Sequence, residues 1–541
     1  LTDVSQYSAS RSCVICFSLR IRFMFSMTIC SKSISTNFDI KTFLKTFTNL
    51  IDSECTKFDT FCFFRIFMPF ISFSFALFFV ILAILYFAVQ NIHSRDNLVQ
   101  QILLFAASLV FYAFADLRFV PFLFYIIAFT YLAGRFCKNR LLLALFIIAD
   151  LAQLLFFKYV PQNWHKHLIF PLGLSFFTFQ SVSYIADVYT KKICAEKNPL
   201  TVALFVSFFP VISSGPIQRA GNLIPQLKTP HTFDYDNATD GMKLFAWGMF
   251  KKLCIADRIA VYVNFVYGNI SDSHSLALLL ATALYSFQIY CDFSGYSDMA
   301  IGCAKFFGFD AGKNFDHPYL SKSVGEFWRR WHISLSSWLR DYVYIPLGGS
   351  RVALPRIYAN LVITFLVSGI WHGSTVNFVI WGLLHGAYQC AGRALKPLLE
   401  KAKTPSFVKI AVTFCLVTFA WIFFRASSLS EAFTVIRGIS YAPADVLSLL
   451  SLKNTIGVKE ALRTVFALTD DAFGGFSGMA TLLAVLLPFL CISIATRNTD
   501  GLSLIRKQNA PIRWCAYLFL VLLIWILQPS SYSGNFIYQN F

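Results

Sequence analysis

The sequence predicts an all-helical protein that crosses a membrane many times. Of its 541 residues, 57% are hydrophobic and only 14% are charged, whereas a soluble globular domain carries about 25% charged residues. Phenylalanine alone occurs 61 times. Apolar runs recur along the chain, and a helix needs about 20 apolar residues to cross the hydrocarbon core. The chain is therefore long enough for roughly ten or more spans.

Charge and cysteine content narrow the classes of partner. The net charge of +18 would also suit nucleic-acid binding, but the basic residues form short clusters between apolar runs. That pattern is typical of loops facing an anionic cytoplasmic leaflet, so we expect a lipid bilayer and no nucleic acid as partner. Cys13 and Cys16 have the spacing of a metal-binding pair, but no second Cys or His pair follows at zinc-site spacing, and no metal is expected.

The first part of the chain differs from the rest. Residues 1–67 begin with Leu1 and mix Ser, Thr, Cys, Phe and Lys without a sustained period, whereas Met68 opens a clean apolar run. No small-residue cleavage site follows a compact apolar segment, so this is not a signal peptide. We interpret 1–67 as a non-native upstream extension or a disordered segment, and 68–541 as one membrane domain.

The apolar runs predict both complete spans and broken helices. Several runs are too short to cross upright, and such segments are often re-entrant or buried within the protein. Pro171, Gly173, Pro210 and residues 213–216 interrupt them. Non-helical backbone at membrane depth requires protein or a water-filled cavity to satisfy it, which predicts an internal cavity. The runs are 70–90, 101–116, 118–134, 141–157, 168–188, 200–214, 243–268, 276–291, 293–308, 357–371, 375–392, 407–424, 475–495 and 513–528.

The basic segment 322–356 predicts the orientation of the protein. It carries six basic residues against Glu326 and Asp341, so by the positive-inside tendency it faces the cytoplasm. Apolar residues within it recur at spacings of three and four, which predicts an amphipathic helix lying at the membrane interface. These apolar residues are Phe327, Trp331, Leu335, Trp338 and Leu339.

Histidines within apolar sequence are the first candidates for a functional site. Ionisable residues are costly in a span, and histidine suits proton transfer near neutral pH. His372 precedes Gly373 at the end of the run 357–371, where the helix can break. It could act as a general base on a hydroxyl group, or simply bond a neighbouring helix. His332 could lie at headgroup level or help to bind an anion, and His385 could line a tunnel or be structural.

Arginines and carboxylates complete the candidate set. Arg329, Arg330 and Arg340 could hold the phosphates of a cytoplasmic donor, because guanidinium pairs well with phosphate; lipid headgroups would satisfy them equally. Asp292 and Asp298 are carboxylates inside apolar sequence.

These two carboxylates could pair with Lys305 or Arg258, orient a histidine, or line the cavity, and structural pairing is the simplest interpretation. Lys158, a cation in another apolar run, belongs to the same class.

Together, several motifs resemble the membrane-bound O-acyltransferase family, most closely its bacterial branch of alginate O-acetyltransferase and the D-alanyl transfer protein of teichoic acid. The resemblance runs from about Met68 to the C-terminus. Its motifs are NFDHPY at 314–319, FWRRWHISLS at 327–336, WLRDYVYIPLGG at 338–349, GIWHG at 369–373 and WGLLHG at 381–386.

The resemblance implies a fold and a reaction. The fold would be a ring of about 11–14 transmembrane, re-entrant and interfacial helices around a central tunnel. His372 would be the catalytic base, and His332 the second family histidine near the cytoplasmic mouth. A cytoplasmic donor, acetyl-CoA or an acyl carrier protein, would supply the acyl group, with no bound cofactor. A periplasmic or membrane-anchored acetyltransferase partner would receive it at the bacterial inner membrane.

Three hypotheses for the function remain open at this point. The first is O-acylation, most simply acetylation, of an extracellular polysaccharide such as alginate, with D-alanyl or peptidoglycan-type transfer as a variant. The second is a transporter or flippase with an intramembrane histidine relay, against which the lack of internal repeats argues. The third is a membrane scaffold in which both histidines are structural.

Overall fold

The computed structural model describes residues 69–90, 97–160, 171–213, 215–469, 474–499 and 501–528. Within these ranges the regular structure is entirely helical. The proposed boundary of the membrane domain at residue 68, and the interpretation of residues 1–67, lie outside the described residues and stay predictions.

The helices, in chain order, are as follows. The first group is α3 (Phe73–Ala88), α4 (Leu98–Ala115), η3 (Leu117–Phe119), α5 (Val120–Phe136), α6 (Arg140–Tyr159), α7 (Leu174–Tyr189), α8 (Pro199–Ser207), α9 (Phe209–Ile212) and α10 (Ala220–Lys228). The middle group is α11 (Tyr235–Phe250), η5 (Lys251–Ala256), α12 (Asp257–Gly268), α13 (Ser275–Phe306), η6 (Pro318–Leu320), α14 (Val324–Arg330), α15 (Ile333–Leu339), η7 (Arg340–Tyr344), α16 (Leu354–His372) and α17 (Val376–Ala394). The last group is α18 (Lys396–Lys401), α19 (Ser406–Arg425), α20 (Leu429–Ser440), α21 (Ala442–Ile456), α22 (Val458–Val465), α24 (Gly475–Ala495), α25 (Gly501–Arg506) and α26 (Ala510–Leu527).

The helices confirm the all-helical, multi-pass membrane class. Among the described residues, eight helices are long and apolar enough to cross a membrane, or nine if the bent pair α20 and α21 counts as one span. The clearest is α26, none of whose apolar window is buried inside the protein and in which Trp514 and Trp525 are exposed. Apolar side chains exposed to this extent require a lipid surface.

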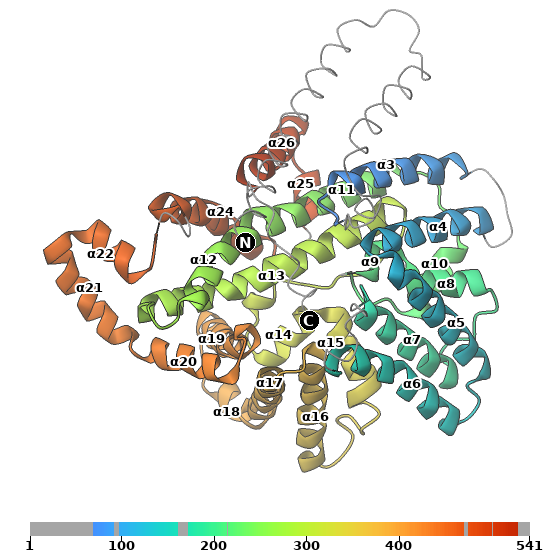
Figure 1. Cartoon of the computed structure of the whole chain (residues 1–541), viewed down its shortest axis with the longest axis horizontal. Helices are drawn as coiled ribbons and strands as arrows, with labels where there is room; N and C mark the ends of the chain where they lie inside the picture. The colour runs from blue at the N-terminus through green and yellow to red at the C-terminus, as the bar shows by residue number, and fades with distance from the viewer. Residues whose placement is uncertain are drawn as a thin grey trace, which may run out of the picture. The chain divides into compact units, whose positions relative to one another are not determined.

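Helix α13 lies at the centre of the described helices, with α11 alongside it (Figure 1). The sequence predicted two separate runs, 276–291 and 293–308, divided at Asp292. The structure instead has one helix of 32 residues, because an ion pair neutralises the Asp292 side chain inside it.

Glycines allow α11 and α13 to meet backbone to backbone. Gly241 and Gly248 of α11 face Gly302 and Gly295 of α13. A Cβ added at Gly302 would lie 2.5 Å from the carbonyl oxygen of Gly241, and one added at Gly248 would lie 2.5 Å from that of Gly295. Small residues at such crossings let membrane helices approach closely, and this contact brings the lysines that follow α11 up to the carboxylates of α13.

Replacing Gly302 by leucine should separate these two helices and destabilise the protein by about 1–3 kcal/mol or more. The new side chain would collide with the backbone of α11, which cannot move aside as a flexible side chain could. Gly392 is a matched control in α17, because a Cβ there would have no heavy atom within 4 Å. Thermal unfolding of the two purified variants in detergent measures the difference. Equal midpoints for Gly302→Leu and Gly392→Leu would contradict the packing argument.

The described helices enclose two hydrophobic cores, and α13 contributes to both. One core is formed mainly by the helices from α3 to α10, with Phe293 and Met299 of α13. The other is formed by α12, α14, α17, α19, α20 and α24, with Tyr285 and Ile289 of α13. In Figure 1 the early helices accordingly lie on one side of α13 and the orange helices α19 to α22 on the other.

Broken helices occur where proline and glycine predicted them. The α8 helix ends before Phe208, and α9 begins at Phe209 with Pro210 in its first turn. Gly173 has a left-handed φ of 74° at the start of α7. A side chain on Gly173 would collide with the carbonyl of Ile212, so the two predicted breaks pack against each other.

Two long segments that lie between the predicted apolar runs contain helices. Residues 217–242 include α10 and the beginning of α11, and residues 426–474 include the three helices α20, α21 and α22.

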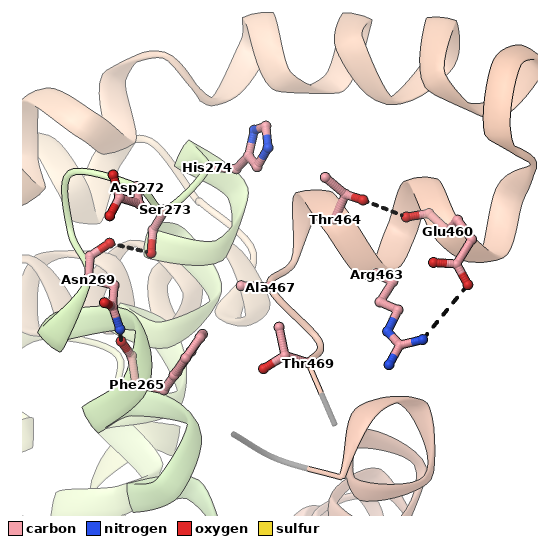
Figure 2. A pocket seen from close by; sticks show the side chains of 10 residues that line it. All are labelled: Phe265, Asn269, Asp272, Ser273, His274, Glu460, Arg463, Thr464, Ala467 and Thr469. Carbon is pink, nitrogen blue, oxygen red and sulfur yellow. Dashed lines mark hydrogen bonds and ion pairs between the residues drawn. The ribbon is translucent and has the colours of Figure 1, made fainter. Parts of the chain in front are cut away.

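A pocket opens between α22 and the connection from α12 to α13, lined among others by His274 and Arg463 (Figure 2). None of the candidate site residues lines this pocket. A central tunnel through the fold stays a prediction.

Candidate functional site

His332 lies in a break between two short helices. α14 ends at Arg330 and α15 begins at Ile333, while His332 itself has the left-handed dihedrals φ 42° and ψ 55°. Two backbone hydrogen bonds hold this break against the preceding segment. The N–H of Ile333 donates to the carbonyl of Asn314 at 2.9 Å, and the N–H of Asp316 donates to that of Arg330 at 2.9 Å. An unfavourable backbone conformation persists only where its surroundings determine it, as here.

This break corrects the prediction of one amphipathic helix at the interface. A continuous helix would have kept the aromatic stripe on one outer face, but the turn at His332 directs it inward. Trp331 and His332 are each only 1% exposed, and Trp331 packs against Trp421 of α19. His332 is therefore buried within the protein and is not exposed to lipid or water.

His372 is the last residue of α16, at a second break. Gly373 continues in an extended conformation, and a side chain there would collide with the ring of Phe378 in α17. Gly369, one turn earlier, lies against Gly382 of α17, so the two helices touch closely at this end. These glycines let α16 end directly against α17, and they leave His372 only 3% exposed.

Tryptophans join the three candidate histidines into one cluster. The ring of Trp371 lies 6.4 Å from that of His332 and 4.5 Å from that of His372. The ring of Trp381 lies 4.9 Å from both His372 and His385. Because Trp371 belongs to one hydrophobic core and Trp381 to the other, the cluster lies at the junction of the two cores. The structure thus brings together histidines that are 53 residues apart at most in the sequence.

Asn314 determines which nitrogen of His332 carries a proton. The Asn314 Nδ2 donates to Ser297 Oγ at 3.1 Å, which identifies Oδ1 as the acceptor. That oxygen accepts from Ser334 Oγ at 2.9 Å and lies 3.1 Å from His332 Nδ1. The Nδ1 atom must therefore donate, so in the neutral imidazole the lone pair lies on Nε2. Among the described residues, this buried Nε2 has no hydrogen-bond partner.

The opposite tautomer holds for His385. The indole N–H of Trp328 donates to His385 Nδ1 at 3.2 Å, so the neutral ring carries its proton on Nε2. That Nε2 is buried and has no partner among the described residues. His385 therefore presents a donor, and His332 an acceptor, within one aromatic cluster.

The three candidate arginines are more exposed than the buried histidines, and two of them form ion pairs. Arg330 forms a 2.9 Å ion pair with Glu326, and Arg340 forms a 2.8 Å ion pair with Asp341. Arg329 is exposed, and in the described part of the chain it has no carboxylate partner. Arg329 is thus the guanidinium most available to an anion.

Asp292 and Asp298 form ion pairs, as the simplest interpretation held, but with other partners than those expected. Lys252 lies 2.7 Å from Asp292 and 2.7 Å from Asp257, and Lys251 lies 2.7 Å from Asp298. The expected partners bind elsewhere: Lys305 lies 3.8 Å from Asp240, and Arg258 donates to the carbonyl of Leu527.

Sequence reasoning missed several residues around the histidines. Asn314 lies in one of the motifs, and Trp371 and Trp381 stand near histidines in the sequence, but no local pattern reveals the contacts of these three residues. Lys251 and Lys252 stand within an apolar run. Two adjacent lysines within an apolar run indicate carboxylate partners in another span.

Comparison with known proteins identifies the relatives of this chain. The model of the membrane-bound O-acyltransferase family matches residues 122–430. The chain is 36% identical over 401 residues to the peptidoglycan O-acetyltransferase of Helicobacter pylori, covering 65% of this chain and 76% of that protein. It is 38% identical over 357 residues to a protein of Azotobacter vinelandii named "Probable alginate O-acetylase", covering 62% and 71%. It is 31% identical over 284 residues to the teichoic acid D-alanyltransferase of Bacillus subtilis, covering 49% and 71%.

The matched residues 122–430 make up more than half of the chain and contain all three histidines and their tryptophans. The family resemblance noted in the sequence is thereby confirmed. This multi-pass membrane protein belongs to the membrane-bound O-acyltransferase family and is an enzyme of O-acyl transfer.

Proposed function

We propose that the protein moves an acetyl group from a cytoplasmic donor across the inner membrane of a bacterium, toward O-acetylation of a cell-envelope polysaccharide such as alginate. The observation that carries this proposal is the buried cluster of His332, His372 and His385 at the junction of two cores. The names of the relatives support acetyl transfer, since the two at 36% and 38% identity are named as O-acetylating proteins. D-alanyl transfer is the alternative, supported by the relative at 31% identity.

The chemistry requires one base and one leaving group. His372 takes the proton of the acceptor hydroxyl as that oxygen attacks the carbonyl carbon of the thioester. The carbon–sulfur bond then breaks, the thiolate leaves with the bonding electron pair, and it takes up the proton that the hydroxyl lost. A site away from bulk water keeps the thioester from hydrolysis, which agrees with the burial of this cluster.

The donor approaches from the basic side of the protein in this proposal. His372 lies about 24 Å along the α16 axis from Arg356, at 1.5 Å per residue. The acyl group would thus travel most of the hydrocarbon thickness. A phosphate-bearing donor such as acetyl-CoA, or an acyl carrier protein, fits the basic segment 322–356. A second, periplasmic or membrane-anchored acetyltransferase would receive the acetyl group and modify the polymer.

Arg329 is the arginine expected to contact the donor. Replacing it by alanine should raise the KM for acetyl-CoA by about 10-fold with kcat little changed, because a charge-assisted hydrogen bond contributes about 1.5–3 kcal/mol to uniform binding. Arg340→Ala, which removes a guanidinium already paired with Asp341, is the matched control. Initial rates at varied acetyl-CoA concentration separate the two constants, and an identical KM in both variants would exclude Arg329 from donor binding.

Asn314 is expected to act through His332. Asn314→Ala should lower kcat by about 10–100-fold, because the imidazole loses the hydrogen bond that fixes its tautomer and orientation. Asn314→Asp, which keeps an acceptor oxygen, should recover part of the loss. Full activity in the alanine variant would show that the His332 tautomer has no role.

The proposal as a whole is tested in inverted membrane vesicles, whose cytoplasmic face is outside. Vesicles containing the protein are given acetyl-CoA labelled in its acetyl group, with the envelope genes next to it expressed or absent. We expect hydroxylamine-sensitive label, the signature of an ester, above that of vesicles lacking the protein. Label from a D-alanyl donor and not from acetyl-CoA would establish the alternative, whereas coupled solute uptake without any ester would favour a transporter.

A further inference from the structure

The end of α16 that carries His372 is held by two side chains from α6. The Lys158 ammonium donates to the carbonyl of Trp371. The Tyr159 hydroxyl lies 2.5 Å from the carbonyl oxygen of Ile370 and 3.2 Å from that of Gly373, and its proton can reach either. These contacts join segments more than 200 residues apart in the sequence.

These contacts supply hydrogen-bond donors to carbonyl groups that the break at Gly373 leaves without helical partners. The last carbonyls of any helix lack an intrahelical partner, and in an apolar setting each unsatisfied group costs free energy. The chain becomes extended at Gly373, so no further helical turn supplies donors. A cation also interacts favourably with the partial negative charge at a helix C-terminus. Lys158 and Tyr159 thus complete the turn on which His372 stands.

Lys158 differs from the other lysines buried among these helices. Lys251 and Lys252 each have a carboxylate at 2.7 Å, whereas within the described residues Lys158 has no carboxylate partner. It lies instead over the ring of Trp371, 5.1 Å from its centre. A structural ion pair is the simplest interpretation of Lys158 in the sequence, but the described residues supply no carboxylate for it. A charge in a spanning helix that is not neutralised by a carboxylate is expensive, so the contacts with the end of α16 and with Trp371 are the ones on which Lys158 depends.

We propose that Lys158 and Tyr159 are positioning residues for His372, which hold the last turn of α16 so that the imidazole stays between Trp371 and Trp381. This inference rests on the proposed acyl transfer for its kinetic consequence. The action is indirect: both residues bind backbone carbonyls on either side of His372. A displacement of about 1 Å at such a group costs about 100-fold in rate.

Two conservative series test the proposal in the full-length protein. Lys158→Met keeps the aliphatic stem but removes the donor and the charge, and Lys158→Arg restores both. Tyr159→Phe removes only the hydroxyl group. Lys138→Met is the matched control, because Lys138 is exposed and lies two residues before α6. We expect kcat to fall about 10–100-fold in Lys158→Met, with the KM for acetyl-CoA within twofold. Lys158→Arg should return to within about threefold of the original protein, and Lys138→Met should be unchanged.

Hydrogen exchange of the peptide spanning residues 365–376 provides a readout independent of activity. Exchange there should be faster in Lys158→Met and Tyr159→Phe than in the original protein, and unchanged in Lys138→Met. Unchanged exchange in both variants would overturn the proposal, as would original kcat in both. If the original protein transfers no acyl group, the proposed function fails, and the exchange result alone decides whether Lys158 and Tyr159 hold this helix end.

Discussion

Replacing His372 by alanine should lower acyl transfer by about 100–10,000-fold, the range that a positioned acid–base group contributes. The amount of membrane-inserted protein should stay the same. The imidazole fills a space between the rings of Trp371, Trp381 and Phe424, so the cavity left by alanine costs stability but keeps the helices in place. The measurement is the initial rate of ester formation in inverted vesicles at matched expression.

His274→Ala is the matched control for this variant. His274 lies at the pocket between α22 and the α12–α13 connection, 3.6 Å from Asp445, and should be dispensable for the reaction. Normal transfer by His372→Ala would remove this residue from the chemistry. Loss of activity in both histidine variants would point to a general effect of the substitutions.

Replacing Lys252 by methionine should lower the free energy of unfolding by about 3–5 kcal/mol, since it leaves carboxylates buried without their countercharge. Lys252 lies 2.7 Å from both Asp257 and Asp292, and Lys252 and Asp292 are each no more than 2% exposed in their side chains. Thermal unfolding of the purified protein in detergent, followed by size-exclusion chromatography, measures the loss.

Two variants separate the buried charge from the loss of packing. Lys252→Met combined with Asp257→Asn and Asp292→Asn removes all three charges and should recover most of the lost stability. Lys305→Met, at a partly exposed lysine 3.8 Å from Asp240, should change the midpoint little because exposed pairs contribute about 0–1 kcal/mol. A triple variant as unstable as Lys252→Met would contradict the electrostatic explanation.

Local sequence predicted the elements that depend on local properties. Long apolar runs became the spanning helices α6, α19, α24 and α26, because apolar length alone decides whether a helix can cross a bilayer. Breaks were placed at Gly173 and Pro210 because these residues alter the backbone wherever they stand. The motifs around His332 and His372 pointed to the family for the same reason, since a motif is itself a local pattern.

The inward turn at His332 could not be predicted from its own residues. The spacing of Phe327, Trp331 and Trp338 is that of a helix with one apolar face, and an interfacial helix satisfies that spacing. The break depends on Asn314, whose backbone carbonyl and side chain both bind the turn from a different segment. A hydrogen bond between distant segments has no signature in either segment alone.

The sequence by itself determined the membrane class, several of the spans and the family, and it pointed to three candidate histidines, because hydropathy and motifs are properties of neighbouring residues. Only the tertiary structure decided that Trp371 and Trp381 join these histidines, that Lys251 and Lys252 neutralise the aspartates of α13, and that Lys158 supports the end of α16. Each of these contacts depends on which helices pack together. Helix packing is in turn stabilised by close contacts such as those between the glycines of α11 and α13. Such contacts form only when the whole bundle is assembled, so they cannot be predicted from neighbouring residues.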